Sequence, residues 1–144
     1  MTDTWLGFVQ ERLNTAAMPM GELFSFELLE ADRGKVLARA RADEQHYNPL
    51  GVVQGGFAAT VLDIVLGLVS ITVLPDHAGG VSTIDLSVTY LRPVYETTGW
   101  LNLEAEAVHA GSTVVVARAV LKDERGKTHA FAQSNSLVMP ANRA

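Results

Sequence analysis

The sequence contains no cysteine and only four histidines in 144 residues. The lack of cysteine excludes disulfides, a thiolate nucleophile and cysteine-based metal sites, and four scattered histidines give zinc few ligands. Basic residues are also few, because 11 Lys and Arg stand against 16 Asp and Glu, for a formal net charge of -5. That balance gives no electrostatic reason to bind a phosphate backbone. We therefore expect no metal, no nucleic-acid partner and a reducing, cytoplasmic location.

Two organisational features are missing as well. The N-terminal stretch MTDTWLGFVQERL has no basic region followed by an apolar one, so it does not resemble a secretory signal. No shift in composition and no Pro/Ser-rich stretch divides the chain. With 48% hydrophobic and 19% charged residues, residues 1–144 are predicted to form one globular domain.

The most hydrophobic segment is FAATVLDIVLGLVSITVL, residues 57–74, in which Asp63 is the one charged residue. Eighteen residues reach the lower limit for spanning a bilayer. However, Asp63 would cost about 2.5–3.5 kcal/mol there, and no Lys or Arg flanks either end. A helix enclosed by protein is the better interpretation, and we expect no membrane partner.

Sequence periodicity predicts an α+β fold around this helix. Thr4 can cap a short N-terminal helix with an apolar stripe, and the central helix should run from Gly55 to Leu74, where Pro75 stops it. Alternating or β-branched patterns predict six strands, at 23–30, 35–42, 81–92, 99–109, 113–123 and 127–138. Because strands and helices do not alternate, the sheet should be antiparallel.

The central helix is expected to need a second subunit. An antiparallel sheet can curl around it, but six strands of this length cannot wrap it fully. The uncovered flank, with the small residues Ala58, Ala59 and Gly67, would then be covered by another copy of the chain. Burial alone therefore predicts at least a dimer.

The stretch HYNPLGVVQGG, residues 46–56, leads directly into the helix. A helix start offers free backbone N–H groups and the positive end of the helix dipole, which together can hold an oxyanion. The Gln54 and Asn48 amides can donate further hydrogen bonds or hold the loop, and Gly55 lets a carbonyl approach the backbone. The alternative is purely structural: the glycine pair permits a tight turn that Asn48 begins.

Asp63 presents a similar choice. A carboxylate inside an apolar helix costs several kcal/mol unless it finds donors or raises its pKa, so it is either partnered or retained for use. The neighbours one turn away offer at most the Thr60 hydroxyl. A hydrogen bond to Thr60, or to a distant Ser or Thr, is the structural alternative to a catalytic role.

The spacing of the two features argues for a shared site. Asp63 lies eight residues beyond Gly55, which is about 12 Å along a helix axis. That is too far for Asp63 to act on an acyl carbon held at its own helix start. If two helices lie antiparallel across a twofold axis, Asp63 of each would reach the Gly55 end of the other, and two sites would form at the interface.

Together, HYNPLGVVQGGFAATVLD and the later STIDLSVTYLRPV resemble the hotdog-fold acyl-CoA thioesterases of the phenylacetate-degradation type, in the 4-hydroxybenzoyl-CoA thioesterase superfamily. The resemblance covers roughly residues 20–140 and depends on residues at matching spacing, namely Asn48, Pro49, Gly51, Gly55, Gly56 and Asp63. It implies an antiparallel sheet wrapped around a central helix, in homodimers that pair into homotetramers.

The resemblance also implies roles for individual residues. Asp63 matches the catalytic carboxylate, as nucleophile or as general base for water, and the Gly55 N–H matches the donor that polarises the thioester carbonyl. Asn48 and Thr83 match positions that orient water or substrate. The substrate is then an acyl-CoA, with coenzyme A part of the substrate and no cofactor. The candidate substrate-binding residues are Gly56, His46, Ser82 and Arg92, with no chemical step assigned to His46.

Two positions depart from the family pattern. Gln54 stands where much of the family has His; it can position a group but does not take up charge near neutral pH. Many members carry a cation after the glycine of the late hairpin, whereas Gly111 is followed here by Ser112 and Thr113. Cations that could hold the coenzyme A phosphates instead are Arg92, Arg118 and Lys122, each of which could equally be an ordinary solvated side chain.

Three functions follow from this pattern. The first is thioester hydrolysis, with the carbonyl bound at Gly55 and attacked by, or with the help of, Asp63. The second is a hydroxyacyl-thioester dehydratase on the same fold, which would need a histidine and a carboxylate set for proton transfer. The third is a protein that binds or senses acyl groups without turnover.

Overall fold

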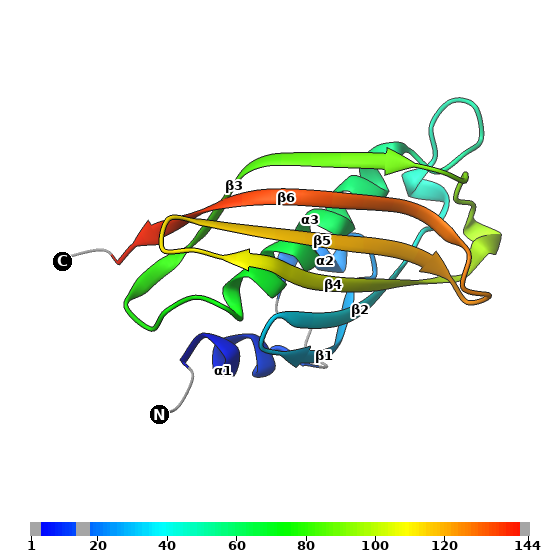
Figure 1. The fold of residues 1–144 in the computed structure, drawn as a ribbon. Helices are drawn as coiled ribbons and strands as arrows, with labels where there is room; N and C mark the ends of the chain where they lie inside the picture. The colour runs from blue at the N-terminus through cyan, green and yellow to red at the C-terminus, as the bar shows by residue number, and fades with distance from the viewer. Residues whose placement is uncertain (1–3, 14–17, 142–144) are drawn as a thin grey trace.

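The computed structural model describes residues 4–13 and 18–141 (Figure 1). The predicted α+β class is confirmed, with one antiparallel sheet curled around a long central helix. The helices are α1 (Thr4–Gln10), α2 (Pro19–Glu22) and α3 (Gly55–Ile71), with short 3₁₀ helices η1 (Glu44–His46) and η2 (Glu96–Thr98). The strands are β1 (Glu27–Asp32), β2 (Lys35–Arg41), β3 (Ala78–Tyr90), β4 (Trp100–Ala110), β5 (Val114–Asp123) and β6 (Thr128–Pro140).

The strands lie in the order β1-β2-β4-β5-β6-β3, and every neighbouring pair is antiparallel. The predicted hairpin β1–β2 and the meander β4–β5–β6 are therefore confirmed. β1 and β3 form the two edges. Between β2 and β3 the chain passes through α3, which crosses the concave face of the sheet (Figure 1).

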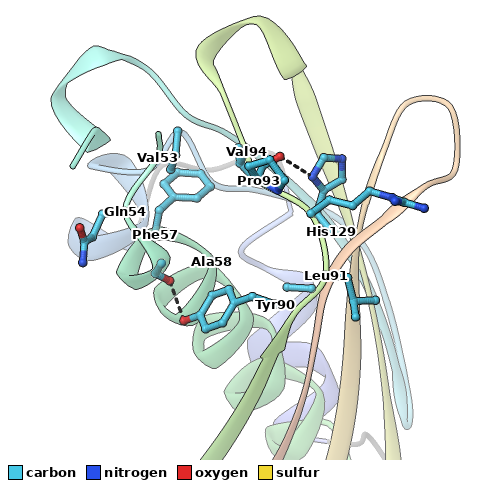
Figure 2. Close-up of a pocket in the computed structure, with 12 residues that line it drawn as sticks. Val53, Gln54, Phe57, Ala58, Tyr90, Leu91, Pro93, Val94 and His129 are labelled. Atoms are coloured by element: carbon cyan, nitrogen blue, oxygen red, sulfur yellow. Dashed lines mark hydrogen bonds between the residues drawn. The ribbon is translucent and has the colours of Figure 1, made fainter. Parts of the chain in front are cut away.

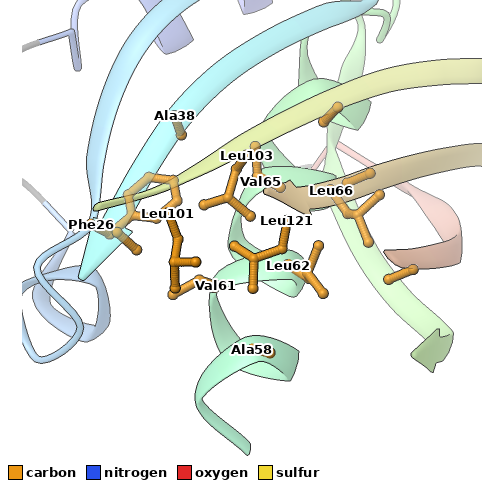
Figure 3. Packing of buried hydrophobic residues seen from close by; sticks show 14 of the residues in the cluster. Phe26, Ala38, Ala58, Val61, Leu62, Val65, Leu66, Leu101, Leu103 and Leu121 are labelled. Atoms are coloured by element: carbon orange, nitrogen blue, oxygen red, sulfur yellow. The ribbon is translucent and has the colours of Figure 1, made fainter. Parts of the chain in front are cut away.

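The core lies between α3 and the sheet, as Figure 3 shows. Strand residues that alternate along β4 and β5 point inward, and each fully buried Leu or Val stabilises the fold by roughly 1.5–3 kcal/mol. Side chains with no exposed surface come from both layers, namely Val61, Leu62, Val65 and Leu66 on α3 and Leu101, Leu103 and Leu121 on the strands. This contact fixes the rotation of α3 about its axis.

One flank of α3 is not covered by the sheet. The partly exposed residues recur at helical spacing along it: Ala59, Thr60, Asp63, Ile64, Gly67 and Ile71. Ala58, predicted to lie on this flank, is instead buried in the core, because it occupies the face that packs on the strands. Asp63 therefore lies at the border of the apolar core, and not inside it.

Several predicted boundaries are wrong by one to four residues; β3, for example, was predicted at 81–92 and runs from Ala78 to Tyr90. α3 ends at Ile71 and not at Leu74, because the buried Thr72 bonds outside the helix, its hydroxyl oxygen accepting from Gly34 N at 2.9 Å. The first strand starts at Glu27 and not at residue 23, since α2 precedes it and Ser25 turns the chain with a φ of 49°. Thr4 is the first residue of α1, where it was predicted to cap it.

No helix within residues 4–13 and 18–141 combines the length and hydrophobicity needed to cross a membrane. α3 has 17 residues, and its apolar face is buried against the sheet.

Candidate active site

The loop before α3 is held by Asn48. Its side-chain oxygen accepts hydrogen bonds from Leu50 N at 2.9 Å and Val52 N at 3.2 Å, and its backbone N–H donates to Val52 O at 2.7 Å. Gly51 adopts a φ of 78° in this turn, a left-handed conformation that glycine tolerates best. The Asn48 amide therefore does hold the loop, which was one of its two predicted uses.

The loop leads into the N-terminus of α3, which has no side-chain cap. Gln54 is the N-cap residue, but its side chain makes no capping hydrogen bond. The first N–H groups of α3, beginning at Gly55, have no partners inside the helix and carry the positive end of its dipole. Gly56 is exposed beside them. The helix start at which an oxyanion was predicted to bind is thus partly exposed and has no side-chain cap.

Tyr90, at the end of β3, covers the other side of Gly55. Its hydroxyl donates to Gly55 O at 2.9 Å, and a Cβ added at Gly55 would lie 3.2 Å from Tyr90 Cζ. A side chain at position 55 would therefore crowd the Tyr90 ring, and this contact within the chain favours glycine there. This contact is independent of the prediction that Gly55 leaves space for a substrate carbonyl.

Asp63 meets Thr83. The Thr83 hydroxyl donates to Asp63 Oδ1 at 3.1 Å, whereas Thr60 donates to Gly56 O at 2.8 Å and is not the partner of Asp63. Two residues predicted for the site, one on α3 and one on β3, are therefore brought together. The other carboxylate oxygen, Oδ2, accepts no hydrogen bond from the described residues.

The remaining predicted residues lie apart from Asp63. Asn48, Gln54, Gly55 and Gly56 gather at the start of α3, and the rise of the helix puts Asp63 about 12 Å further along. Within one chain the predicted site residues therefore lie in two separate places.

A cleft of about 300 Å³ opens at the start of α3 (Figure 2). α3 forms one wall and the segment that follows β3 forms the other. The lining is mostly apolar, with polar groups from Gln54, Tyr90, Arg92 and His129. Arg92 is therefore close to the helix start. Arg118 and Lys122 lie elsewhere, paired with Glu106 and Glu104 across β4 and β5.

Of the residues predicted to bind substrate, His46 and Ser82 have the positions least suited to direct contact with it. The His46 ring packs against Phe57, 5.0 Å between centroids; its Nδ1 accepts from Asp43 N at 3.0 Å, and its Nε2 lies 2.8 Å from Leu23 O. Both ring nitrogens are thus used within the chain. Ser82 is exposed on β3 and, as the neighbour of Thr83 in a strand, points to the other face of the sheet.

The residues that sequence patterns missed are Tyr90, His129 and Asp123. Tyr90 belongs to the motif STIDLSVTYLRPV, but its contact with Gly55 depends on how β3 crosses α3, which periodicity does not give. Asp123 and His129 flank the turn between β5 and β6, and their side chains meet at 3.0 Å between Oδ2 and Nε2. The turn sequence was a usable signal, because a hairpin brings its flanks together. Within the described residues there is no group of three or more potential metal ligands.

The six-stranded antiparallel sheet around a long central helix is the hotdog arrangement, and sequence comparison gives the family. The family model described as the thioesterase superfamily matches residues 50–130, more than half of the chain. The chain therefore belongs to the thioesterase superfamily, and the predicted family and enzyme class, a thioester hydrolase, are confirmed.

Individual relatives agree with this assignment. The chain is 31% identical over 104 residues to acyl-coenzyme A thioesterase 13 of Homo sapiens, which covers 72% of this chain and 61% of the human protein. It is 29% identical over 114 residues to a candidate esterase of Saccharolobus solfataricus, covering 77% and 79% of the two chains. The chain thus spans less than two thirds of the human relative.

Among solved structures, the chain is similar to a candidate thioesterase of Ralstonia eutropha that is related to phenylacetic acid degradation. The TM-score is 0.78 at 25% sequence identity, and the match covers 93% of this chain and 98% of the other. The shared fold therefore extends beyond the residues that the family model matches.

Proposed function

We propose that the protein hydrolyses acyl-CoA thioesters to a free acid and coenzyme A. The observation that carries this proposal is the Asp63 carboxylate, partly exposed on α3 and held through one oxygen by Thr83. The cleft beside Gly55 and the similarity to the human acyl-coenzyme A thioesterase 13 support the same substrate class.

In the proposed mechanism the Gly55 N–H polarises the thioester carbonyl, and Asn48 and Gln54 shape the loop around it. Asp63 of the partner subunit attacks the carbonyl carbon or removes a proton from an attacking water. If Asp63 acts as the base, the water hydroxyl joins the acyl carbon, the carbon–sulfur bond breaks, and the thiolate takes the proton that Asp63 removed. If Asp63 attacks directly, the thiolate leaves an anhydride between Asp63 and the acyl group, and water hydrolyses it to the free acid, restoring the carboxylate and supplying the proton of the thiol. Thr83 holds Asp63 Oδ1, which leaves Oδ2 available for the reaction.

The subunit arrangement is part of the proposal. A dimer would cover the partly exposed flank of α3 and the edge strand β3, on which Ile84 is 57% exposed, together with Leu91 just after it, which is 54% exposed. Leu50, 87% exposed at the tip of the loop before α3, is a further apolar contact. Pairing of dimers into tetramers and a cytoplasmic location remain predictions.

The dehydratase alternative is weakened by the histidines. Both ring nitrogens of His46 are bonded within the chain, and those of His129 lie against Pro93 O and Asp123 Oδ2. Neither ring has a nitrogen left to exchange a proton with an acyl chain. Binding without turnover is the remaining alternative, and only an activity measurement separates it from hydrolysis.

The test is thiol release from a panel of acyl-CoAs by the wild type and by Asp63→Asn. We expect cleavage of at least one panel member and a loss of about 10²–10⁴-fold in kcat for the variant. Asp85→Asn is the matched control, because Asp85 is a carboxylate on β3 that bonds Asn135 instead of facing α3. No cleavage above background, or full activity of Asp63→Asn, would refute hydrolysis; acyl-CoA binding without cleavage would establish the binding protein.

A further inference from the structure

His129 is a buried histidine, 6% exposed, whose ring lies between two oxygen acceptors. Nδ1 is 3.1 Å from Pro93 O, and Nε2 is 3.0 Å from Asp123 Oδ2. A backbone carbonyl and a carboxylate only accept hydrogen bonds, so both contacts are hydrogen bonds only if both ring nitrogens carry protons. The geometry therefore fits an imidazolium whose charge is balanced by Asp123.

Asp123 is itself fixed in place. Its Oδ1 accepts from Arg125 N at 2.9 Å and from Lys127 N at 3.0 Å, which closes the turn between β5 and β6. The hydrogen bond from His129 is the main cause that lowers the pKa of the Asp123 carboxyl below its ordinary value. The carboxylate that faces His129 is thus charged and held by the turn.

From this fixed point His129 holds the segment that follows β3. Its backbone oxygen accepts from Leu91 N at 2.8 Å and Arg92 N at 3.1 Å, while its ring bonds Pro93 O. The next residue, Val94, accepts from Val53 N at 3.0 Å. Figure 2 shows His129 beside Pro93, with Phe57 and Gln54 on the opposite side of the cleft.

These bonds form one continuous path from the β5–β6 turn to the residue before Gln54. The segment 91–94 forms a wall of the cleft, and Val53 leads directly into the N-terminus of α3. A shift of this segment would therefore move the N–H group of Gly55. Displacements of about 1 Å at a reacting centre cost as much as 10²-fold in rate.

We propose that His129, as an imidazolium bonded to Asp123, is a positioning residue that holds segment 91–94 and thereby the glycine end of α3. It does not exchange protons with the substrate, because both ring nitrogens are occupied. Its effect on turnover rests on the proposed thioester hydrolysis, whereas its charge state and its hold on the loop do not. The two can be tested separately.

The charge state is tested by ¹⁵N NMR of the whole protein with labelled histidine at neutral pH. We expect both His129 ring nitrogens to show protonated shifts in the wild type, and one to lose its proton in Asp123→Asn. A neutral ring with one bare nitrogen in the wild type would overturn the proposal.

The hold on the loop is tested by hydrogen exchange of the Val53 amide in His129→Gln, with His109→Gln, an exposed histidine on β4, as the control. We expect exchange at Val53 to rise about 10-fold or more in His129→Gln alone, and kcat to fall about 10–100-fold with little change in KM. If His129→Gln does not fold, Asp123→Asn serves for the same measurements. Unchanged Val53 exchange would overturn the proposal, whether or not any thioester is cleaved.

Discussion

At the scale of single residues, Tyr90 packs closely against Gly55. The phenol ring lies where a side chain at position 55 would begin, and its hydroxyl bonds the Gly55 carbonyl. A residue predicted to make room for a substrate is therefore also held by its own chain. Because Gly55 contacts Tyr90 and is also the proposed carbonyl-binding residue, even a methyl group added at position 55 should have an effect.

We predict that Gly55→Ala lowers both stability and activity. The added methyl would lie 3.2 Å from Tyr90 Cζ, so the ring must give way slightly, and weakening of its hydrogen bond to Gly55 O costs about 0.5–1.5 kcal/mol in the free energy of unfolding. Urea denaturation and kcat/KM measure the two effects. Gly7→Ala is the control, because its methyl would meet no atom within 4 Å; equal stability of the two variants would contradict the prediction.

The sequence identified most of the residues that gather near α3, for a physical reason. A lone carboxylate in an apolar helix and a glycine pair before it are both costly unless used, so they stand out without a structure. Side-chain contacts between different strands, or between a strand and α3, leave no such signal in the sequence. The partner of Asp63 was among several candidate hydroxyls, and Tyr90 and His129 were missed, because cross-strand register decides which side chains meet.

At the scale of elements, the long helix and the meander β4–β5–β6 were predicted well because their apolar residues follow one period. β1 was placed too early, since Leu23, Phe24 and Phe26 continue a strand-like pattern through a segment that follows α2 and contains the left-handed Ser25. Local alternation alone does not distinguish a strand from the turn that leads into it. The end of α3 was missed for a related reason, because Thr72 bonds to a distant loop.

The hairpin β5–β6 should carry a pH dependence set by Asp123. Its pKa is lowered in the folded protein, chiefly by the hydrogen bond from His129. A lowered pKa stabilises the fold above the unfolded value of about 3.9, and this contribution is lost as the pH falls through the folded pKa. We predict that the stability difference between wild type and Asp123→Asn is present above pH of about 4 and shrinks below it, as the Asp123 carboxylate takes up its proton.

Chemical denaturation of both proteins from pH 7 down to acid measures this difference. Asp85→Asn, in the same buffers, controls for the general effect of removing a carboxylate. A difference between wild type and Asp123→Asn that stays constant through the acid range would contradict the assignment of this pH dependence to Asp123.

At the scale of the whole molecule, the proposed sharing of sites between subunits gives a strict test. Asp63→Ala and Gly55→Val should each be inactive alone, for different half-sites. A hybrid of the two variants pairs the intact glycine of one subunit with the intact carboxylate of the other at one of its two sites. Purified hybrids, separated by different tags, should therefore regain about half of the wild-type activity.

Both parent proteins must be shown to fold and to exchange subunits, by circular dichroism and by recovery of doubly tagged species. Hybrids as inactive as their parents would show that Gly55 and Asp63 do not act across an interface.

The order of strands on the sheet also bears on how the chain folds. β4, β5 and β6 join through short turns, so their contacts close small loops early, at little cost in chain entropy. β3 must instead find β6 across a long loop, since Asp85 and the Asn135 that bonds it are 50 positions apart. We expect the edge strand to be added late, and with it Thr83. The hydroxyl that orients Asp63 would then be among the last groups to arrive, so a partly folded chain would have a hydrophobic core before it had a catalytic carboxylate in place.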